Sequence, residues 1–523
     1  MNAAVAEHAR VPHRRMITIS IMLATIMQAL DTTIANVALP HMEGSLQASQ
    51  DQIMWVLTSY IVASAITMPL TGWLCGQWGR RRVFLASVIG FTISSALCGM
   101  ANSLPEIVAA RLLQGVFGSA LVPLSQAVLL DINPIEKIGQ AMAIWGAGIM
   151  VGPILGPLLG GWLTENYNWR WVFYINLPVG LMALWGIETF LPESRPARER
   201  LDRFGLITLS IAIGMLQLFL DRGEQQGWFQ SWEIRLELAA AVVSFAFFVV
   251  HTWTVEGESF FDRDLLKDRN FVTGLLFAFI VGMILYGTMA LLPTLLQNLM
   301  DYPVVYTGEV TAPRGIGTML AMIVVGRLVH RIDVRAIMAV GFALTAFALY
   351  QMTDLTLQMD ANLIIVSGFI QGLGIGLTFV PLSAATFATL APRLRHQGTP
   401  IYSLLRNIGS SVGISIVQAR LTESASAAHA RIAATVAPGN HALAQLPQLV
   451  DPSNPVGLAV LNAEVTRQGA LLGYIDDFGF MMWITLAVIP LLLVIRGSHP
   501  APAAPKAGAE IDPDEVAAAV ETP

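Results

Sequence analysis

The feature that most constrains this chain is a series of apolar stretches, each long enough to cross a membrane and nearly free of charge. Roughly 20 apolar residues span a bilayer as one helix. In lipid the backbone must satisfy its own hydrogen bonds, and alternating barrel-type strands are absent, so the spans should be helices. Only 13% of the 523 residues are charged, against about 25% in soluble domains. The sequence therefore predicts an all-α membrane protein.

The apolar stretches predict fourteen transmembrane helices. The first apolar stretch follows the basic residues Arg14 and Arg15, an arrangement that resembles a signal peptide. The stretch is too long for a signal peptide and contains Asp31, so we expect it to be retained as a transmembrane helix. The expected spans lie near residues 16–37, 52–73, 83–101, 107–130, 140–163, 172–191, 204–221, 234–253, 272–297, 308–329, 334–353, 361–391, 398–420 and 477–496.

Most of the lysine and arginine residues lie in the loops on one side of these spans. Positive loops stay in the cytoplasm, so the distribution predicts an inner-membrane protein with both termini cytoplasmic. Residues 1–15 would be a short cytoplasmic N-terminus. Residues 497–523, which are acidic and rich in Ala and Pro, would be a disordered cytoplasmic tail. No feature suggests nucleic-acid binding.

Short motifs repeat at a nearly constant distance along the chain. Gln114-Gly115 and the following Val122–Ser125 motif recur as Gln371-Gly372 and Val380–Ser383, which places spans 4 and 12 in correspondence. An even offset of eight spans preserves orientation, as in transporters built from two parallel repeats. We expect two six-helix halves, 16–191 and 272–496, with 192–253 as an inserted helix pair (spans 7 and 8).

The predicted outer loop 422–475, between spans 13 and 14, is polar and too long for a simple turn. It would be either a periplasmic docking element for a partner or a partly helical flap without a special role. The sequence does not separate these two interpretations.

Charges inside the membrane are costly and are therefore functional candidates. Asp31 lies in the middle of span 1 with Gln28 one turn before it, and Thr25, Ala29, Thr32 and Asn36 form an adjacent stripe of small and polar residues. Such a face should line a cavity, and a carboxyl group can carry a proton or bind substrate there. The alternative is that Asp31 is the static partner of a buried arginine.

Three arginines also lie within spans. Arg111 has Gln114 one turn away and would be a fixed charge that tunes a carboxylate or, alternatively, pairs with backbone carbonyls. Arg314 and Arg406 would line the C-terminal half of a central cavity, together with Asn407 and Gln371, or else extend toward a membrane surface.

Span 5 carries a glycine at every fourth position, with two prolines between them. Such a stripe lets another helix approach closely, and the prolines permit a bend. The pattern suits a helix at a moving interface between the halves, although simple tight packing is the alternative. The residues are Gly148, Gly152, Pro153, Gly156, Pro157 and Gly160.

Several kinds of site are not indicated. The nine histidines show no metal-ligand spacing, and there is no phosphate-binding Gly-x-x-x-x-Gly-Lys loop. We therefore expect no metal and no cofactor, with an ion gradient as the energy source. Cys75 and Cys98 should lie near opposite membrane faces and remain unpaired.

The chain resembles the major facilitator superfamily and, within it, the fourteen-span drug:proton antiporters of the EmrB/QacA type. The similarity runs from about residue 16 to 496. It is carried by the span-1 motif Leu30–Pro40, the loop motif Gly72–Arg82, the span-4 motif Arg111–Gly115, the span-5 antiporter motif Gly148–Gly161 and the subfamily-typical Trp169–Pro178.

This resemblance implies an alternating-access transporter in which Asp31 and Arg111 take part in proton coupling and span 5 couples drug to proton movement. The long loop before Tyr474 resembles that of EmrB-type pumps, which work with a periplasmic adaptor and an outer-membrane channel. In the loop motif, Gly76 replaces the usual acidic residue. The gating loop would then depend on Gly72, Arg80, Arg81, Arg82 and Asp131.

The resulting hypothesis is a proton-coupled exporter of small hydrophobic or amphipathic compounds. A cationic substrate would interact with ionised Asp31, and a neutral one would depend on aromatic and aliphatic lining. Alternatives are a dedicated exporter of one metabolite or antibiotic and a proton-coupled nutrient importer. A membrane-embedded enzyme or sensor would need clustered catalytic or ligand-binding residues, and none is found.

Overall fold

The computed structural model describes residues 13–134, 137–193, 201–255, 262–329, 331–436 and 455–495. This part of the chain is helical and contains no β-strand. Residues 1–12 of the predicted N-terminal segment and the whole predicted tail 497–523 lie outside the described residues.

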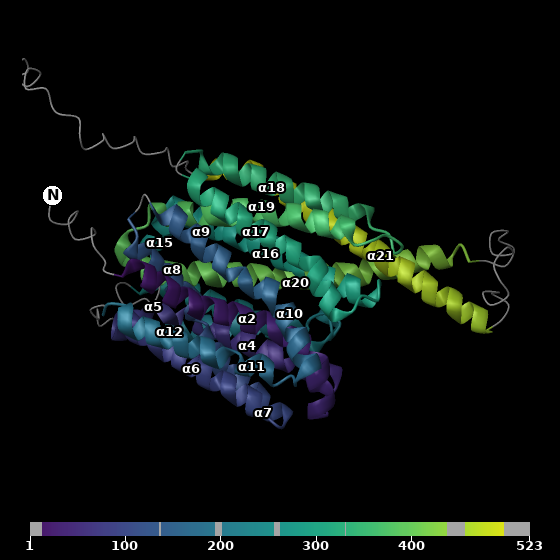
Figure 1. The fold of residues 1–523 in the computed structure, drawn as a ribbon, viewed down its shortest axis with the longest axis horizontal. Helices are drawn as coiled ribbons and strands as arrows, with labels where there is room; N and C mark the ends of the chain where they lie inside the picture. The colour runs from purple at the N-terminus through teal and green to yellow at the C-terminus, as the bar shows by residue number, and fades with distance from the viewer. Residues whose placement is uncertain are drawn as a thin grey trace, which may run out of the picture.

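The N-terminal half is a bundle of helices that run side by side (Figure 1). Three predicted spans are broken where a proline lacks the N–H that would continue the helix: Pro69 follows the end of α4, Pro123 follows the end of α7, and Pro153 follows the end of α9. The helices are α2 (Arg14–Leu46), α3 (Gln50–Ile53), α4 (Trp55–Thr67), α5 (Leu70–Trp78), α6 (Arg80–Met100), α7 (Leu104–Gly118), α8 (Leu121–Ile132), α9 (Ile138–Ile149), α10 (Val151–Asn166), α11 (Trp171–Tyr174) and α12 (Asn176–Phe190).

The C-terminal half packs beside the N-terminal half, and the predicted inserted pair lies between them in sequence (Figure 1). Helix α13 of this pair contacts both α4 and α20, so it connects the two halves along one side. The remaining helices are α13 (Arg203–Arg222), α14 (Trp232–Thr254), α15 (Asp264–Lys267), α16 (Arg269–Asn298), α17 (Val304–Leu328), α18 (Val334–Gln351), α19 (Asn362–Ala388), α20 (Arg395–Ala433) and α21 (Pro455–Val488).

Each of the fourteen predicted spans overlaps one of these helices or a broken run of them, although the last span, 477–496, extends beyond the end of α21 at Val488. Among the described residues, eleven helices are long and apolar enough to cross a membrane, or twelve if the bent pair α4–α5 is one span. The two predicted spans that fail the test are α17 and α20. Both carry buried polar residues, such as Thr318 and Ser403, because they pack between the halves. The chain is a multi-pass membrane protein.

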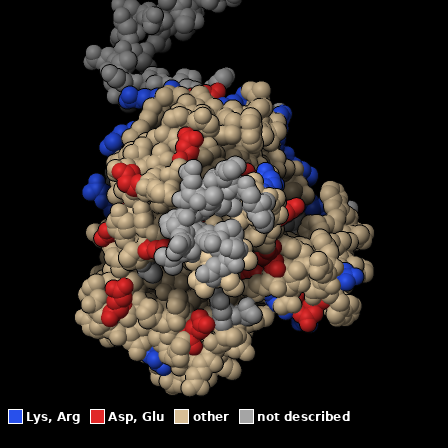
Figure 2. Space-filling view, turned by 90° about the vertical axis from the view of Figure 1, so that its right-hand side faces the viewer, with Lys and Arg blue, Asp and Glu red and all other residues tan. Residues whose placement is uncertain are grey.

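The structure describes the two ends of the predicted loop 422–475, and most of this described part is helical. Helix α20 continues to Ala433 and α21 begins at Pro455, so the two helices reach beyond the rest of the bundle (Figure 1). Seen from that end, acidic side chains are spread over a mainly uncharged surface, and most basic ones lie toward its edges (Figure 2). The central part of the loop, residues 437–454, lies outside the described residues.

Candidate functional site

Asp31 and Arg111 form an ion pair in the interior of the N-terminal half. Asp31 is fully buried and Arg111 is 1% exposed. The Arg111 guanidinium lies 2.7 Å from Oδ2 of Asp31, and its Nε donates to the carbonyl of Val56 at 3.0 Å. The structure thus contains both the buried carboxylate–arginine pair and the backbone contact that the sequence left as alternatives.

Two amide side chains complete the coordination of the Asp31 carboxylate. Gln114 donates to its Oδ1 at 2.8 Å, and Asn176 donates to the same oxygen at 2.7 Å. Gln114 also accepts from Arg111 at 2.8 Å. Because these donors come from α7 and α12, the carboxylate on α2 connects three helices, and any change in its charge alters the hydrogen bonds among them.

An aromatic ring covers the other side of the arginine. The Arg111 guanidinium lies 4.4 Å from the ring centroid of Tyr60 on α4, which is a cation–π contact. The hydroxyl of Tyr60 accepts from Gln28 at 3.0 Å, so Gln28 adjoins the network without touching Asp31. We did not predict Tyr60 or Asn176 as site residues. Asn176 lies in the Trp169–Pro178 motif, which was a signal for it.

The remaining polar residues of span 1 do not join this network. Thr32 is half-buried and donates to the carbonyl of Ala29 at 2.9 Å, whereas Asn36 is exposed. Asp31 therefore faces the interior of its own half, apart from the adjacent stripe that holds Thr32 and Asn36.

The glycine stripe of span 5 packs against the helix that carries Asp31. A Cβ at Gly152 would lie 2.5 Å from the backbone carbon of Ala29, and one at Gly156 would collide with Thr33. The stripe is thus a close contact within the N-terminal half. The contact with the other half uses a different face of α10, where Ile154 meets Gly315 and Pro157 meets Gly308 of α17.

The remaining glycines of the stripe also face α2. Gly148 lies against Met22 and Gly160 against Ile34, both on α2. Pro153 stands at the start of α10, next to the break from α9, and Pro157 lies inside the helix.

The predicted cavity residues of the C-terminal half are only partly brought together. Arg314 donates to the hydroxyl of Thr288 and, at 3.3 Å, to the carbonyl of Leu285. Gln371 donates to the same hydroxyl at 3.3 Å. Arg314 therefore turns into its own half instead of extending toward a membrane surface.

The other two predicted residues of this half lie on α20. Arg406 and Asn407 are half-buried, and the Arg406 guanidinium is 5.7 Å from the ring centroid of Phe379.

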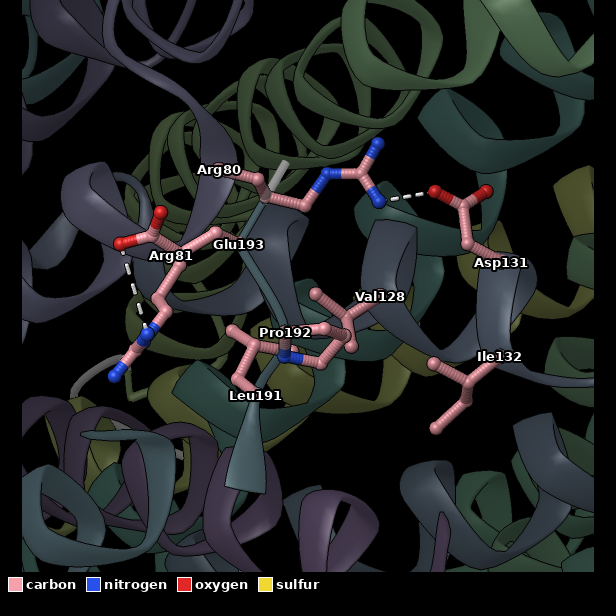
Figure 3. A pocket seen from close by; sticks show the side chains of 8 residues that line it. All are labelled: Arg80, Arg81, Val128, Asp131, Ile132, Leu191, Pro192 and Glu193. Atoms are coloured by element: carbon pink, nitrogen blue, oxygen red, sulfur yellow. Dashed lines mark hydrogen bonds and ion pairs between the residues drawn. The ribbon is translucent and has the colours of Figure 1, made fainter. Parts of the chain in front are cut away.

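The predicted gating loop forms a cluster of ion pairs at the predicted cytoplasmic end. Asp131 pairs with Arg80 (Figure 3). The other oxygen of Asp131 lies 3.7 Å from Arg395 at the start of α20. Arg395 also donates to the carbonyl of Leu130 at 3.1 Å. Asp131 thus joins the N-terminal half to the C-terminal half, in a chain where Gly76 replaces the usual acidic residue.

The neighbouring parts of the gating loop differ in their contacts. Arg81 pairs with Glu193, 3.7 Å away, and the two pairs border a cavity of about 200 Å³ (Figure 3). Arg82 is exposed. Gly72 lies directly against α20, because a Cβ there would be 3.2 Å from the carbonyl of His396. The halves are therefore in contact at this end.

No group of three or more potential metal ligands occurs among the residues that the structure describes. Cys75 and Cys98 are both buried and unpaired, as the sequence predicted.

The comparison with known proteins agrees with this architecture. The Major Facilitator Superfamily matches residues 21–414. In solved structures, the fold is similar to that of the human organic anion transporter MFSD10, with a TM-score of 0.60 and 16% identity, covering 92% of this chain and 100% of that one. It is also similar to the proton:xylose symporter XylE, with a TM-score of 0.59 and 13% identity over 91% and 96% of the two chains.

Sequence relatives are closer than these structures. The multidrug export protein EmrB of Escherichia coli is 36% identical, covering 91% of this chain and 94% of its own. The fatty acid resistance protein FarB of Neisseria gonorrhoeae is 35% identical, covering 92% and 96%. The chain belongs to the Major Facilitator Superfamily and, within it, to the family of EmrB-type multidrug export proteins.

Proposed function

We propose that this protein is a proton-coupled antiporter of the inner membrane that exports small hydrophobic or amphipathic compounds from the cytoplasm. The observation that carries the proposal is the fully buried Asp31 with its Arg111, Gln114 and Asn176 partners, in a chain of the EmrB-type family. Proton binding to Asp31 would weaken its bond to Arg111 and so change the hydrogen bonds that join α2 to α7 and α12.

The coupling follows from where this carboxylate lies. Helix α2 also packs on α10, and the opposite face of α10 contacts α17 of the other half. A change in the charge of Asp31 can therefore reach the interface between the halves through two packed helices. Substrate shifts the same equilibrium only if it binds the inward- and outward-facing states with different affinity. The proton gradient supplies the energy, and no cofactor is required.

The printed names of relatives support the class of substrate. EmrB is a multidrug export protein, and FarB is named for fatty acid resistance. Fatty acids are hydrophobic compounds with a single acidic group, so they belong to the proposed class. The carrier fold supports a transporter over a membrane-embedded enzyme. The proposed orientation, with both termini in the cytoplasm, rests on the distribution of basic loops.

Direction of transport separates export from nutrient import. Inverted membrane vesicles that are energised by respiration should accumulate lipophilic fluorescent compounds, and dissipation of the proton gradient should release them. Accumulation in right-side-out vesicles under the same gradient would instead favour an importer. If only one compound of a broad panel is transported, a dedicated exporter replaces multidrug export.

We also propose that a periplasmic adaptor and an outer-membrane channel complete the system, since the long helices α20 and α21 extend beyond the bundle at the predicted periplasmic end (Figure 1). Affinity purification from native membranes, with a variant lacking residues 434–454 as the matched control, should recover the adaptor with the full chain only. Recovery of no adaptor with either protein contradicts this part of the proposal.

A further inference from the structure

The C-terminal half contains a counterpart of the Asp31 network. Gln371 on α19 donates to Thr288 on α16, as Gln114 on α7 donates to Asp31 on α2. Thr288 follows Asp31 at the same distance along the chain as Gln371 follows Gln114. A neutral hydroxyl therefore stands in the second half where the first half has a carboxylate.

The arginines of the two halves come from different helices. A Cβ on Gly115, which follows Gln114, would collide with the carbonyl of Tyr60, and a Cβ on Gly372, which follows Gln371, would collide with the carbonyl of Arg314. Tyr60 and Arg314 thus occupy corresponding places.

The position of Arg111 in the first half corresponds to Gly368 in the second. The Cβ of Arg314 lies 3.8 Å from where a Cβ at Gly368 would be, and this glycine leaves room for the arginine side chain. In the second half the cation therefore comes from α17 instead of the helix that carries the glutamine.

Arg314 has no counter-ion among the residues that the structure describes. The residue is 8% exposed, its acceptors are the neutral Thr288 hydroxyl and Leu285 carbonyl, and its buried Nε has no hydrogen-bond partner. The Oε1 of Gln371 beside it is also buried without a partner. Within the described residues, Arg314 makes no ion pair with a carboxylate, whereas Arg111 has Asp31 at 2.7 Å.

A second arginine of the same half is also unpaired. Arg406 on α20 has a buried Nε without a hydrogen-bond partner and makes no ion pair with the carboxylates that the structure describes. An uncompensated charge in the interior of a membrane protein is strongly unfavourable. The surroundings of Arg314 therefore lack a compensating negative charge.

We infer that Arg314, with Thr288 and Gln371, forms the site that binds the acidic group of an amphipathic organic anion. A guanidinium presents several N–H donors to a carboxylate or sulfonate in a fixed plane, so the buried Nε and the second terminal nitrogen can bond the acid together. The inference rests on the proposed export function and narrows it, because neither the cationic nor the neutral compounds considered from the sequence would neutralise Arg314.

The test compares three probes that have the same alkyl chain but different head groups: decanesulfonate, decanesulfonamide and decyltrimethylammonium. The sulfonate stays charged and so carries no protons across the membrane by itself. Binding is measured by isothermal titration on the purified full-length protein. In Arg314→Gln the affinity for decanesulfonate should fall about tenfold or more, which is the worth of one charged hydrogen bond. Affinity for the neutral sulfonamide should stay unchanged.

Thr288→Asp is the second variant, since it supplies the missing counter-ion from the chain itself. It should weaken sulfonate binding as Arg314→Gln does while keeping or raising thermal stability, which separates loss of the site from misfolding. Arg331→Gln, which removes an exposed arginine from the loop after α17, is the matched control and should bind all three probes normally.

Equal loss of affinity for sulfonate and sulfonamide would overturn the inference, as would unchanged sulfonate binding in both variants. Proton release in inverted vesicles distinguishes this failure from failure of the export function. If the cationic or neutral probe drives proton release in wild type but the sulfonate neither binds nor drives it, export stands and the anion site is refuted. If no probe drives release, the proposed function itself is in error.

Discussion

Replacing Arg111 with glutamine should expose the energetic role of the buried pair. The substitution leaves Asp31 fully buried without its counter-ion, and among the described residues Gln114 and Asn176 remain as donors at 2.8 and 2.7 Å. Loss of one partner from a buried ion pair costs about 3–5 kcal/mol. Because two amide donors stay in place, we expect a cost near the lower end, about 3 kcal/mol.

The matched variant is Asp31→Asn combined with Arg111→Gln, which removes both charges and retains groups of similar shape. It should recover most of the lost stability, with a coupling energy of about 2 kcal/mol. Reversible unfolding of the purified protein in mixed micelles, for wild type, both single variants and the double variant, gives the four free energies required. If the cost of the double variant equals the sum of the two single costs, the charges do not stabilise one another and the reasoning fails.

Three further predictions concern other parts of the molecule. Asp131→Asn removes the ion pairs of Asp131 with Arg80 and Arg395, so spin labels on the exposed Arg82 and Ala391 should show a larger population of long distances; an unchanged distribution would show that Asp131 does not hold the halves together. Gly152→Ala should destabilise the protein by about 1–3 kcal/mol and slow transport, because its Cβ would meet the backbone of Ala29; Gly44→Ala, with nothing within 4 Å, is the neutral control. Hydrogen bonds from Lys267 and then Arg393 lower the pKa of Asp264, outside the membrane spans. Ionised Asp264 therefore stabilises the folded protein above its ordinary pKa of 3.8, and this stabilisation is lost as the pH falls through the lowered pKa. The unfolding temperature of Asp264→Asn should lack this decrease at acidic pH.

The sequence was sufficient to predict the helices and the membrane-embedded charges. Apolar length locates most of the spans, although α17 and α20 are too polar to be recognised by it, and a charge within a span is conspicuous. It also indicated that Gln371 corresponds to Gln114, because the motif repeats. The partners of these charges depend on three-dimensional packing: Asp31 and Arg111 are far apart in the chain, and Asn176, which completes the site, lies in a motif that we read only as a family signature.

The glycine stripe and the gating loop show the same limit. Regular glycines predict a close helix contact, but spacing does not say which helix makes it, and the structure places α2 there. Arg395 was counted only as one of the basic loop residues. Its contact with Asp131 depends on the docking of the two halves, which leaves no local pattern in the sequence.

Proton release driven by substrate in inverted vesicles, comparing wild type with Asp31→Asn over a panel of lipophilic compounds, tests the central claim most directly. We predict that some compounds dissipate the gradient with wild type and that none does so with the variant, while binding of those compounds is retained. Equal proton release by both proteins would show that Asp31 is only a structural partner of Arg111 and that proton coupling through it is wrong.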